Sequence, residues 1–161
     1  MFNKYAWKQP IFKSDLFPVL LNGLIFCILG GILGGLIDYL AQLIGLSISF
    51  GLIILCYFIG KKVNQGYHSY HILYPTLTIL FMIIGIIFSE FTYLLCYIKS
   101  FEVFKNFISL KFIINIITSP ITSVIKSILV FNLLNTLLYA FNLIMYILAF
   151  VYAYRFAKGR N

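Results

Sequence analysis

Few side chains in this sequence could do chemistry, and the two most notable acids stand at the ends of apolar stretches. Asp38 follows one such stretch and Glu90 closes another. Acids within the membrane are candidates for function by default, so both residues could take part in ion or proton coupling. The alternative is that each acid ends a helix where water hydrates it, and the sequence favours this simpler interpretation. Asp38 is the better candidate, because it shares a helical face with the glycines that precede it.

Two histidines lie three residues apart in the segment GYHSYH. His68 and His71 would share a helical face and could in principle hold a metal ion. No carboxylate or cysteine stands near them in the sequence, and the tyrosines around them are typical of an aromatic belt at a membrane surface. The sequence therefore predicts no metal site and no cofactor. Motifs of hydrolases, zinc proteases and nucleotide-binding proteins are also missing from it, so an enzyme is not expected.

Amides and phenols line one side of the last apolar stretch, which spans 128–153. The residues concerned are Asn132, Asn135, Tyr139 and Asn142. Amides in hydrocarbon are costly unless they find hydrogen-bond partners. They either form hydrogen bonds between helices or between copies of the chain, or they line a polar path or substrate site. The first interpretation is favoured, because intramembrane amides commonly hold helices together.

The composition places these residues in a membrane protein. Of the 161 residues, 62% are apolar and 10% are charged, against about 25% charged in an ordinary globular domain. Soluble enzymes, disordered chains and disulfide scaffolds are excluded. The net charge of +8 is therefore expected to set orientation in the bilayer, and no nucleic-acid partner is predicted.

A helix needs about 20 apolar residues to cross the hydrocarbon, and the chain has four such stretches. We predict one all-α transmembrane domain over 1–161, a polytopic bundle of four helices. The predicted spans are 17–37, 41–60, 72–90 or on to 98, and 128–153.

Between the third and fourth spans we predict an amphipathic helix that lies in the membrane interface, at about 99–119. Its polar stripe would be Glu102, Lys105, Asn106 and Ser109. The apolar residues 112–125 are too few to cross the membrane and are interrupted by Pro120. Ser119 and Pro120 together predict the start of the next helix.

The basic residues are unevenly distributed between the two sides of this topology. The side with both termini and the 61–71 loop carries eight basic residues and one acidic residue. The other side carries four basic and three acidic residues. This bias predicts that both termini are cytoplasmic.

Small residues mark the faces on which the spans should pack, because helices in lipid associate through close backbone approach. The first and second spans should form a tight hairpin. The cysteines within the spans are expected to be reduced packing residues. The predicted packing residues are Gly23, Cys27, Gly31, Gly35, Gly45, Ser49, Gly60, Gly85 and Ser89.

Three local features resemble a widespread group of small bacterial four-span membrane proteins of unknown function, often fused behind a zinc-ribbon module. They are a glycine and basic loop after the second span, an amphipathic segment before the fourth, and an aromatic end to the last helix. The residues are Gly60, Lys61, Lys62, Gly66, Phe101, Glu102, Val103, Tyr152, Tyr154, Arg155 and Phe156. The resemblance implies a small helical bundle and transfers no active residue. Here no zinc ribbon precedes the first span, and Ser119 and Pro120 lie farther from the aromatic cluster.

The sequence thus predicts a non-enzymatic integral protein of a bacterial cytoplasmic membrane. It would act through helix association, as a homo-oligomer or as an accessory subunit of a larger membrane complex. The alternative is a small transporter or channel whose path is lined by Asp38 and by the asparagines at 132, 135 and 142.

Overall fold

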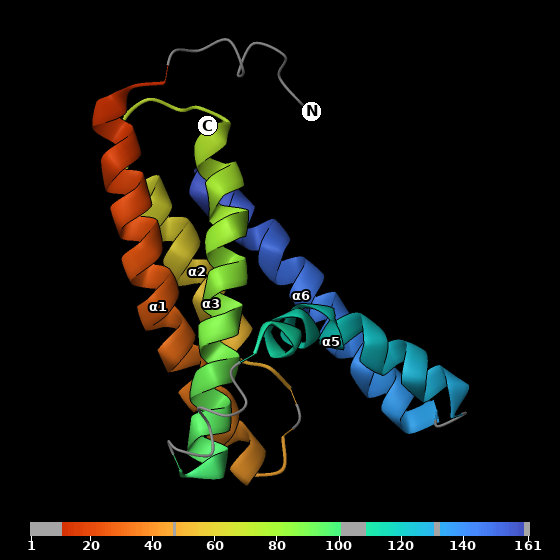
Figure 1. Cartoon of the computed structure of the whole chain (residues 1–161). Coiled ribbons are helices and arrows are strands. Elements are labelled where there is room, and N and C mark those ends of the chain that lie inside the picture. The colour runs from red at the N-terminus through yellow and green to blue at the C-terminus, as the bar shows by residue number, and fades with distance from the viewer. Residues whose placement is uncertain (1–10, 47, 101–108, 131–132, 160–161) are drawn as a thin grey trace.

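The computed structural model describes residues 11–46, 48–100, 109–130 and 133–159. Over these ranges the chain is entirely helical and contains no strand, which confirms the predicted all-α class (Figure 1). The helices are α1 (Lys13–Leu43), α2 (Gly51–Asn64), α3 (Leu73–Ile98), α5 (Leu110–Leu129) and α6 (Leu133–Lys158).

The helices form a bundle from which one helical hairpin projects. α1, α2 and α3 pack against one another, and α6 contacts α2 and α3 with its C-terminal part. The N-terminal part of α6 leaves the bundle obliquely and runs beside α5 (Figure 1). The start of α1, the α2–α3 loop and the end of α6 lie at one end of the bundle, which we call the basic end because Lys13, Lys61 and Arg155 are there.

Among the described residues, four helices are long and apolar enough to cross a membrane, as predicted for a multi-pass membrane protein. They are α1, α3, α5 and α6. The predicted second span, 41–60, is wrong as a helix, because α2 has 14 residues and is only about 21 Å long at 1.5 Å per residue. α5 meets the criterion of length and hydropathy although its apolar segment was predicted to be too short to cross. α2 does not meet it, but this helix returns the chain from the far end of the bundle to the basic end (Figure 1).

The boundary error has a physical cause at the end of α1. This helix does not end at Asp38 but continues to Leu43. It then closes with a Schellman motif, in which Gly45 N–H donates to the Gln42 carbonyl at 2.9 Å and Leu46 N–H donates to the Ala41 carbonyl at 3.0 Å. Gly45 has the positive φ of 80° that this motif needs. It therefore terminates a helix, and the prediction that it packs between helices is wrong.

The predicted helix start at Ser119 and Pro120 is also wrong, because α5 runs through both residues from Leu110. Ser109 caps this helix by accepting a hydrogen bond from Phe112 N–H at 3.2 Å. Proline has no N–H for the Ile116 carbonyl, but the Ser119 hydroxyl donates to that oxygen at 2.9 Å. A serine thus replaces the lost backbone bond, as happens in membrane helices that tolerate proline.

The last two predicted boundaries are settled only in part. α6 begins at Leu133, so the predicted span 128–153 starts within α5 and ends too early. Of the predicted interfacial segment, 101–108 lies outside the described residues, and 110–119 belongs to α5. An interfacial helix at 99–119 stays a prediction for its first half.

Glycines set the spacing of α1 against its two neighbours. A Cβ atom on Gly31 would lie 2.6 Å from the Gly85 carbonyl oxygen of α3, and one on Gly35 would lie 2.2 Å from the Ser89 carbonyl oxygen. Gly34 faces α2, where a Cβ atom on Gly51 would lie 2.4 Å from the Gly34 oxygen. The backbones of these helices are in contact, and dispersion attraction between them is strong because the distances are short.

Alanines play the same part for α6. Ala149, Ala153 and Ala157 are its buried residues, four positions apart. A Cβ atom on Gly60 of α2 would lie 2.7 Å from the Ala153 carbonyl oxygen. The C-terminal part of α6 is therefore held against the bundle by a smooth face of small residues.

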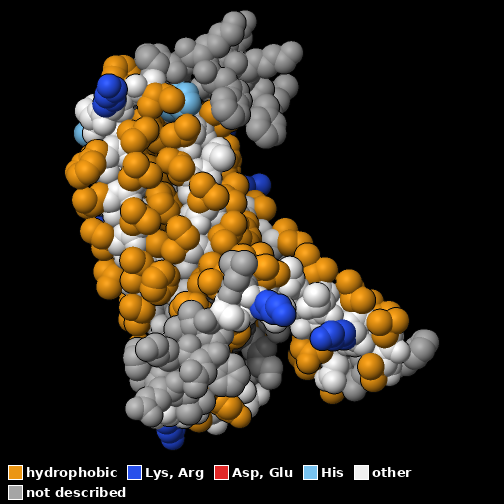
Figure 2. All heavy atoms as spheres, viewed as in Figure 1, with side chains coloured by type: hydrophobic (Ala, Val, Ile, Leu, Met, Phe, Trp, Pro, Cys, Tyr) orange, Lys and Arg blue, Asp and Glu red, His pale blue; other side chains and the backbone are white. Residues whose placement is uncertain are grey.

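The exterior of the bundle suits a lipid environment. Large apolar side chains on α1 are exposed along its length, among them Leu21, Leu29 and Leu40. Apolar atoms cover most of the visible face of the bundle, and basic groups lie near its ends and on the projecting hairpin (Figure 2). The small residues face the interior and the branched residues face outward, as expected for helices in lipid.

Gly31→Val should open the contact between α1 and α3, because the new side chain would meet the Gly85 carbonyl and the Phe88 Cβ atom at 2.8 Å. We expect the free energy of unfolding to fall by about 1–3 kcal/mol, measured by unfolding in mixed detergent micelles. Leu33→Val on the exposed side of α1 is the matched control. Equal stability of the two variants would contradict this packing.

Candidate functional site

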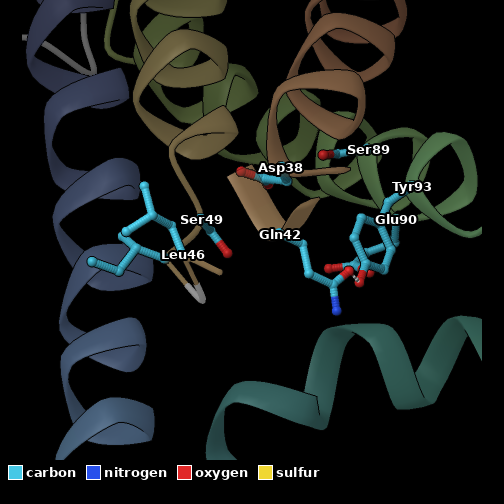
Figure 3. A pocket seen from close by; sticks show the side chains of 8 residues that line it. Asp38, Gln42, Leu46, Ser49, Ser89, Glu90 and Tyr93 are labelled. Atoms are coloured by element: carbon cyan, nitrogen blue, oxygen red, sulfur yellow. Dashed lines mark hydrogen bonds between the residues drawn. The ribbon is translucent and has the colours of Figure 1, made fainter. Parts of the chain in front are cut away.

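A polar pocket lies at the end of the bundle opposite the basic end, between α1, α3 and the α1–α2 connection. Its volume is about 220 Å³ and it is partly open to the outside. Both intramembrane acids face it, together with amide, hydroxyl and phenol groups (Figure 3). The polar residues that line it are Asp38, Gln42, Ser49, Ser89, Glu90 and Tyr93.

Asp38 has a structural role that the sequence did not predict. Its Oδ1 atom accepts a hydrogen bond from Gly51 N–H, the first residue of α2, at 2.8 Å. A carboxylate at this place satisfies a backbone donor that the short helix leaves free and interacts favourably with the positive end of its dipole. Asp38 thus joins α1 to the start of α2, and the prediction that it ends a helix is wrong.

Glu90 lies within α3 and also does not end its helix, which continues to Ile98. Its carboxylate has no hydrogen-bond partner among the described residues. The one ion pair in this part of the chain joins Asp15 to His68. One turn beyond each acid, Tyr93 of α3 donates to the Gln42 Oε1 atom of α1. This bond links α1 and α3 at the pocket, which both residues line.

At the basic end another acid holds a loop in place. Asp15 is only 4% exposed, and its Oδ2 atom accepts from the backbone N–H groups of His68 and Ser69, each at 3.1 Å. Its Oδ1 atom lies 3.3 Å from the His68 Nδ1 atom, although the His68 side chain is 95% exposed. The Asp15 side chain therefore holds the start of α1 against the α2–α3 loop, mainly by accepting hydrogen bonds from backbone N–H groups of the loop.

The two histidines do not converge on a common ligand site. His71 is buried, and its Nδ1 atom accepts from Leu73 N–H at 3.1 Å, which caps α3. His68 instead faces Asp15. In the described residues no group of three or more histidine, cysteine or acidic side chains could hold a metal ion.

The same loop fixes the end of α6. The Tyr67 hydroxyl donates to the Ala157 carbonyl, and Asn64 Nδ2 donates to the Phe156 carbonyl at 3.1 Å. Burial raises the pKa of Tyr67 to about 12, so its phenol stays protonated and remains a donor at neutral pH. These bonds satisfy the last carbonyls of α6, which have no partner in their own helix.

The amide face of α6 lies against α5. Ser123, Lys126 and Ser127 of α5 share a hollow of about 240 Å³ with Asn135 and Tyr139 of α6. A second hollow of about 160 Å³ lies nearer the bundle; its polar lining includes Ser49, Ser119, Ser123, Tyr139, Asn142 and Tyr146. The structure therefore brings three of the predicted polar residues together at this helix pair. The fourth, Asn132, lies outside the described residues.

Most of the predicted packing residues lie where helices meet. Gly23, Cys27, Gly31 and Gly35 are buried on α1, Gly60 on α2, and Gly85 and Ser89 on α3. Ser49 is different, because it lies in the α1–α2 connection and lines two polar hollows. Cys27 and Cys56 are buried among the helices.

Three features of the structure were not predicted from the sequence, although residue spacing could have indicated two of them. Gln42 follows Asp38 by one helical turn, and Tyr93 follows Glu90 by three residues, so each pair shares a face. The alanine face of α6 has the four-residue period of the glycine face of α1. The anchoring role of Asp15 had no such signal, since it depends on a loop more than fifty residues away.

No protein-family model, no curated protein and no solved structure matches this chain. The resemblance to small bacterial four-span proteins therefore stays a prediction from sequence.

Asp38→Ala should lower the free energy of unfolding by about 0.5–2 kcal/mol, the usual effect of losing a helix cap. Asp38→Asn should keep most of the stability, because an amide oxygen can still accept from Gly51 N–H. Glu90→Gln is the matched control and should not lower stability. Unfolding in mixed micelles containing EDTA measures all three. Equal losses for the alanine and asparagine variants would show that charge, and not capping, is what α2 needs.

Proposed function

We propose that this chain is a non-enzymatic integral membrane protein that acts through helix association, as an accessory subunit of a larger membrane complex or as a homo-oligomer. The resemblance seen in the sequence makes a bacterial cytoplasmic membrane the expected location. The observation that carries the proposal is a polar stripe on the outer surface of α5.

The surface of α5 divides into three faces. One face is turned to α6 and α3 and includes Ile116 and Ser127, which are buried. A second, exposed face consists of isoleucines at 114, 117, 121, 125 and 128. The third face, also exposed, is the polar stripe: Lys111, Asn115, Thr118, Thr122 and Lys126.

Lipid is a poor environment for this stripe. The hydroxyls of Thr118 and Thr122 donate to carbonyls of their own helix, but the lysines and the Asn115 amide need other partners. A lysine at the centre of a membrane helix costs about 2.5–3.5 kcal/mol, and less near the helix ends, where Lys111 and Lys126 stand. Because α5 is long and apolar enough to cross, a second protein covering the stripe would remove this cost, while the isoleucine face remains in lipid.

The chemistry of the stripe favours a different protein as the partner. α5 carries lysines at both ends of the stripe and no acid. Two copies joined by a twofold axis through the stripe would place lysine near lysine, which is repulsive. A partner helix with acidic or amide side chains fits this face better than a second copy does.

A photoreactive benzophenone residue introduced at position 122 should form discrete protein adducts in native membranes, because this position lies on the polar stripe. The same residue at position 117, on the isoleucine face, is the matched control and should react with lipid. Electrophoresis and mass spectrometry identify the adducts.

Positions 115 and 118 should behave like 122, and position 125 like 117. Adducts between two copies of the chain would select the homo-oligomer. Protein adducts with no preference for the stripe, or lipid adducts alone at all five positions, would contradict the proposal.

A small transporter or channel is the second candidate, supported by the order of the hollows. Ser49 lines both the acidic pocket and the hollow of about 160 Å³ between α5 and α6. Ser123 and Tyr139 line both hollows of this hairpin. Polar groups thus continue from Asp38 toward Asn135. Altered ion flux in liposomes for Asn142→Leu, with an intact assembly, would favour this candidate.

The distribution of charge supports an orientation with the basic end in the cytoplasm, since lysine and arginine are retained on that side. In a chain whose three cysteines are replaced, Gln65→Cys at the basic end should be protected from an impermeant maleimide in intact cells. Ser100→Cys, after the far end of α3, should react. Labelling of both positions from outside would refute this topology.

A further inference from the structure

The acidic pocket holds more negative charge than the described residues around it neutralise. Asp38 and Glu90 both line it, and no lysine, arginine or histidine is among its lining residues. The one ion pair in the described part of the chain is at the opposite end. Two carboxylates in a partly buried site need a proton or a cation, because an uncompensated charge is costly there.

The Ser89 hydroxyl is a further polar group that faces the pocket. Ser89 is only 8% exposed, and its side chain lines the pocket on the side of Asp38 (Figure 3). Thr78 and Thr92 of the same helix donate to carbonyls four residues earlier. No such bond, and no other partner within the described residues, is found for the Ser89 hydroxyl, so a buried polar group is left facing the cavity.

The available donor atoms are all oxygens. The Asp38 carboxylate caps α2 with its Oδ1 atom and also lines the pocket. The Glu90 carboxylate lines the pocket as well. The Gln42 oxygen accepts from Tyr93 and keeps a second lone pair. Ser89 and Ser49 add hydroxyls. Carboxylate, amide and hydroxyl oxygens suit hard cations, whereas zinc and copper prefer the histidine and cysteine ligands that are missing from this lining.

We propose that this pocket binds one divalent hard cation of the Ca²⁺ and Mg²⁺ class, between Asp38 and Glu90 and with the Ser89 hydroxyl as a third ligand group. A 2+ charge balances both carboxylates. The volume of about 220 Å³ leaves room for several water molecules at about 30 Å³ each, so the ion keeps part of its hydration shell. The lining of the pocket includes no residue of α5, so this proposal does not rest on the partner proposed for that helix.

Titration of the purified full chain in detergent with Mn²⁺, followed by electron paramagnetic resonance, tests the site. The wild-type protein should bind one Mn²⁺ per chain, and Ca²⁺ or Mg²⁺ should displace it. Glu90→Gln and Asp38→Asn should each weaken binding at least tenfold, and Ser89→Ala severalfold. Asp15→Asn, an equivalent change at the opposite end, should leave binding unchanged.

Thermal unfolding provides a second measurement that does not depend on Mn²⁺. A ligand that binds the folded state raises its stability, so Ca²⁺ or Mg²⁺ should raise the melting temperature of the wild type and of Asp15→Asn but not of Glu90→Gln. Stabilisation of the wild type by Na⁺ alone would overturn the divalent assignment. Absence of any effect of millimolar divalent ions on a folded wild type would show that protons alone neutralise the pocket.

Discussion

Close backbone contact between helices is the constraint on which this structure depends. In lipid, burying apolar surface between helices gains little, so association needs short distances and matched shapes. Gly31 and Gly35 bring α1 against α3, and Gly34 brings it against α2. Because Gly35 touches the backbone of Ser89, the next acids along the two helices, Asp38 and Glu90, must face the same space. The glycine face thus determines where the charged pocket forms.

The described acids differ in how completely the fold uses them. Asp15 receives two backbone N–H groups and faces an imidazole, and it is almost fully buried. Asp38 receives the Gly51 N–H group on one oxygen and also lines the pocket. Glu90 accepts no hydrogen bond from a backbone N–H group or an imidazole among the described residues. A carboxylate whose hydrogen bonds are satisfied locally is best explained as an anchor, whereas one that lines a cavity without a partner is best explained by a ligand.

The sequence predicted the class of the fold and the packing faces better than the boundaries of the helices. Glycine at four-residue spacing identified the contact face of α1, because few other roles require it. The predicted boundary at Asp38 is wrong because an acid in an apolar stretch usually indicates the end of a helix. Here the helix continues, and the carboxylate accepts a hydrogen bond from the start of α2. The boundary predicted at Pro120 is wrong for a similar reason, because the Ser119 hydroxyl donates to the carbonyl that the proline leaves without a backbone partner. Both hydrogen bonds depend on geometry that residue types alone do not reveal.

α6 connects the two proposed activities physically. One continuous face of this helix presents Asn142 and Tyr146 to α5 and then Ala149 and Ala153 to the bundle. The hollow beside α5 shares Ser49 with the acidic pocket. A protein that holds α5 therefore fixes one wall of a hollow that adjoins the pocket at Ser49. If the partner changes the affinity for the cation, the cation must change the affinity for the partner by the same factor, because binding free energies around a closed cycle sum to zero.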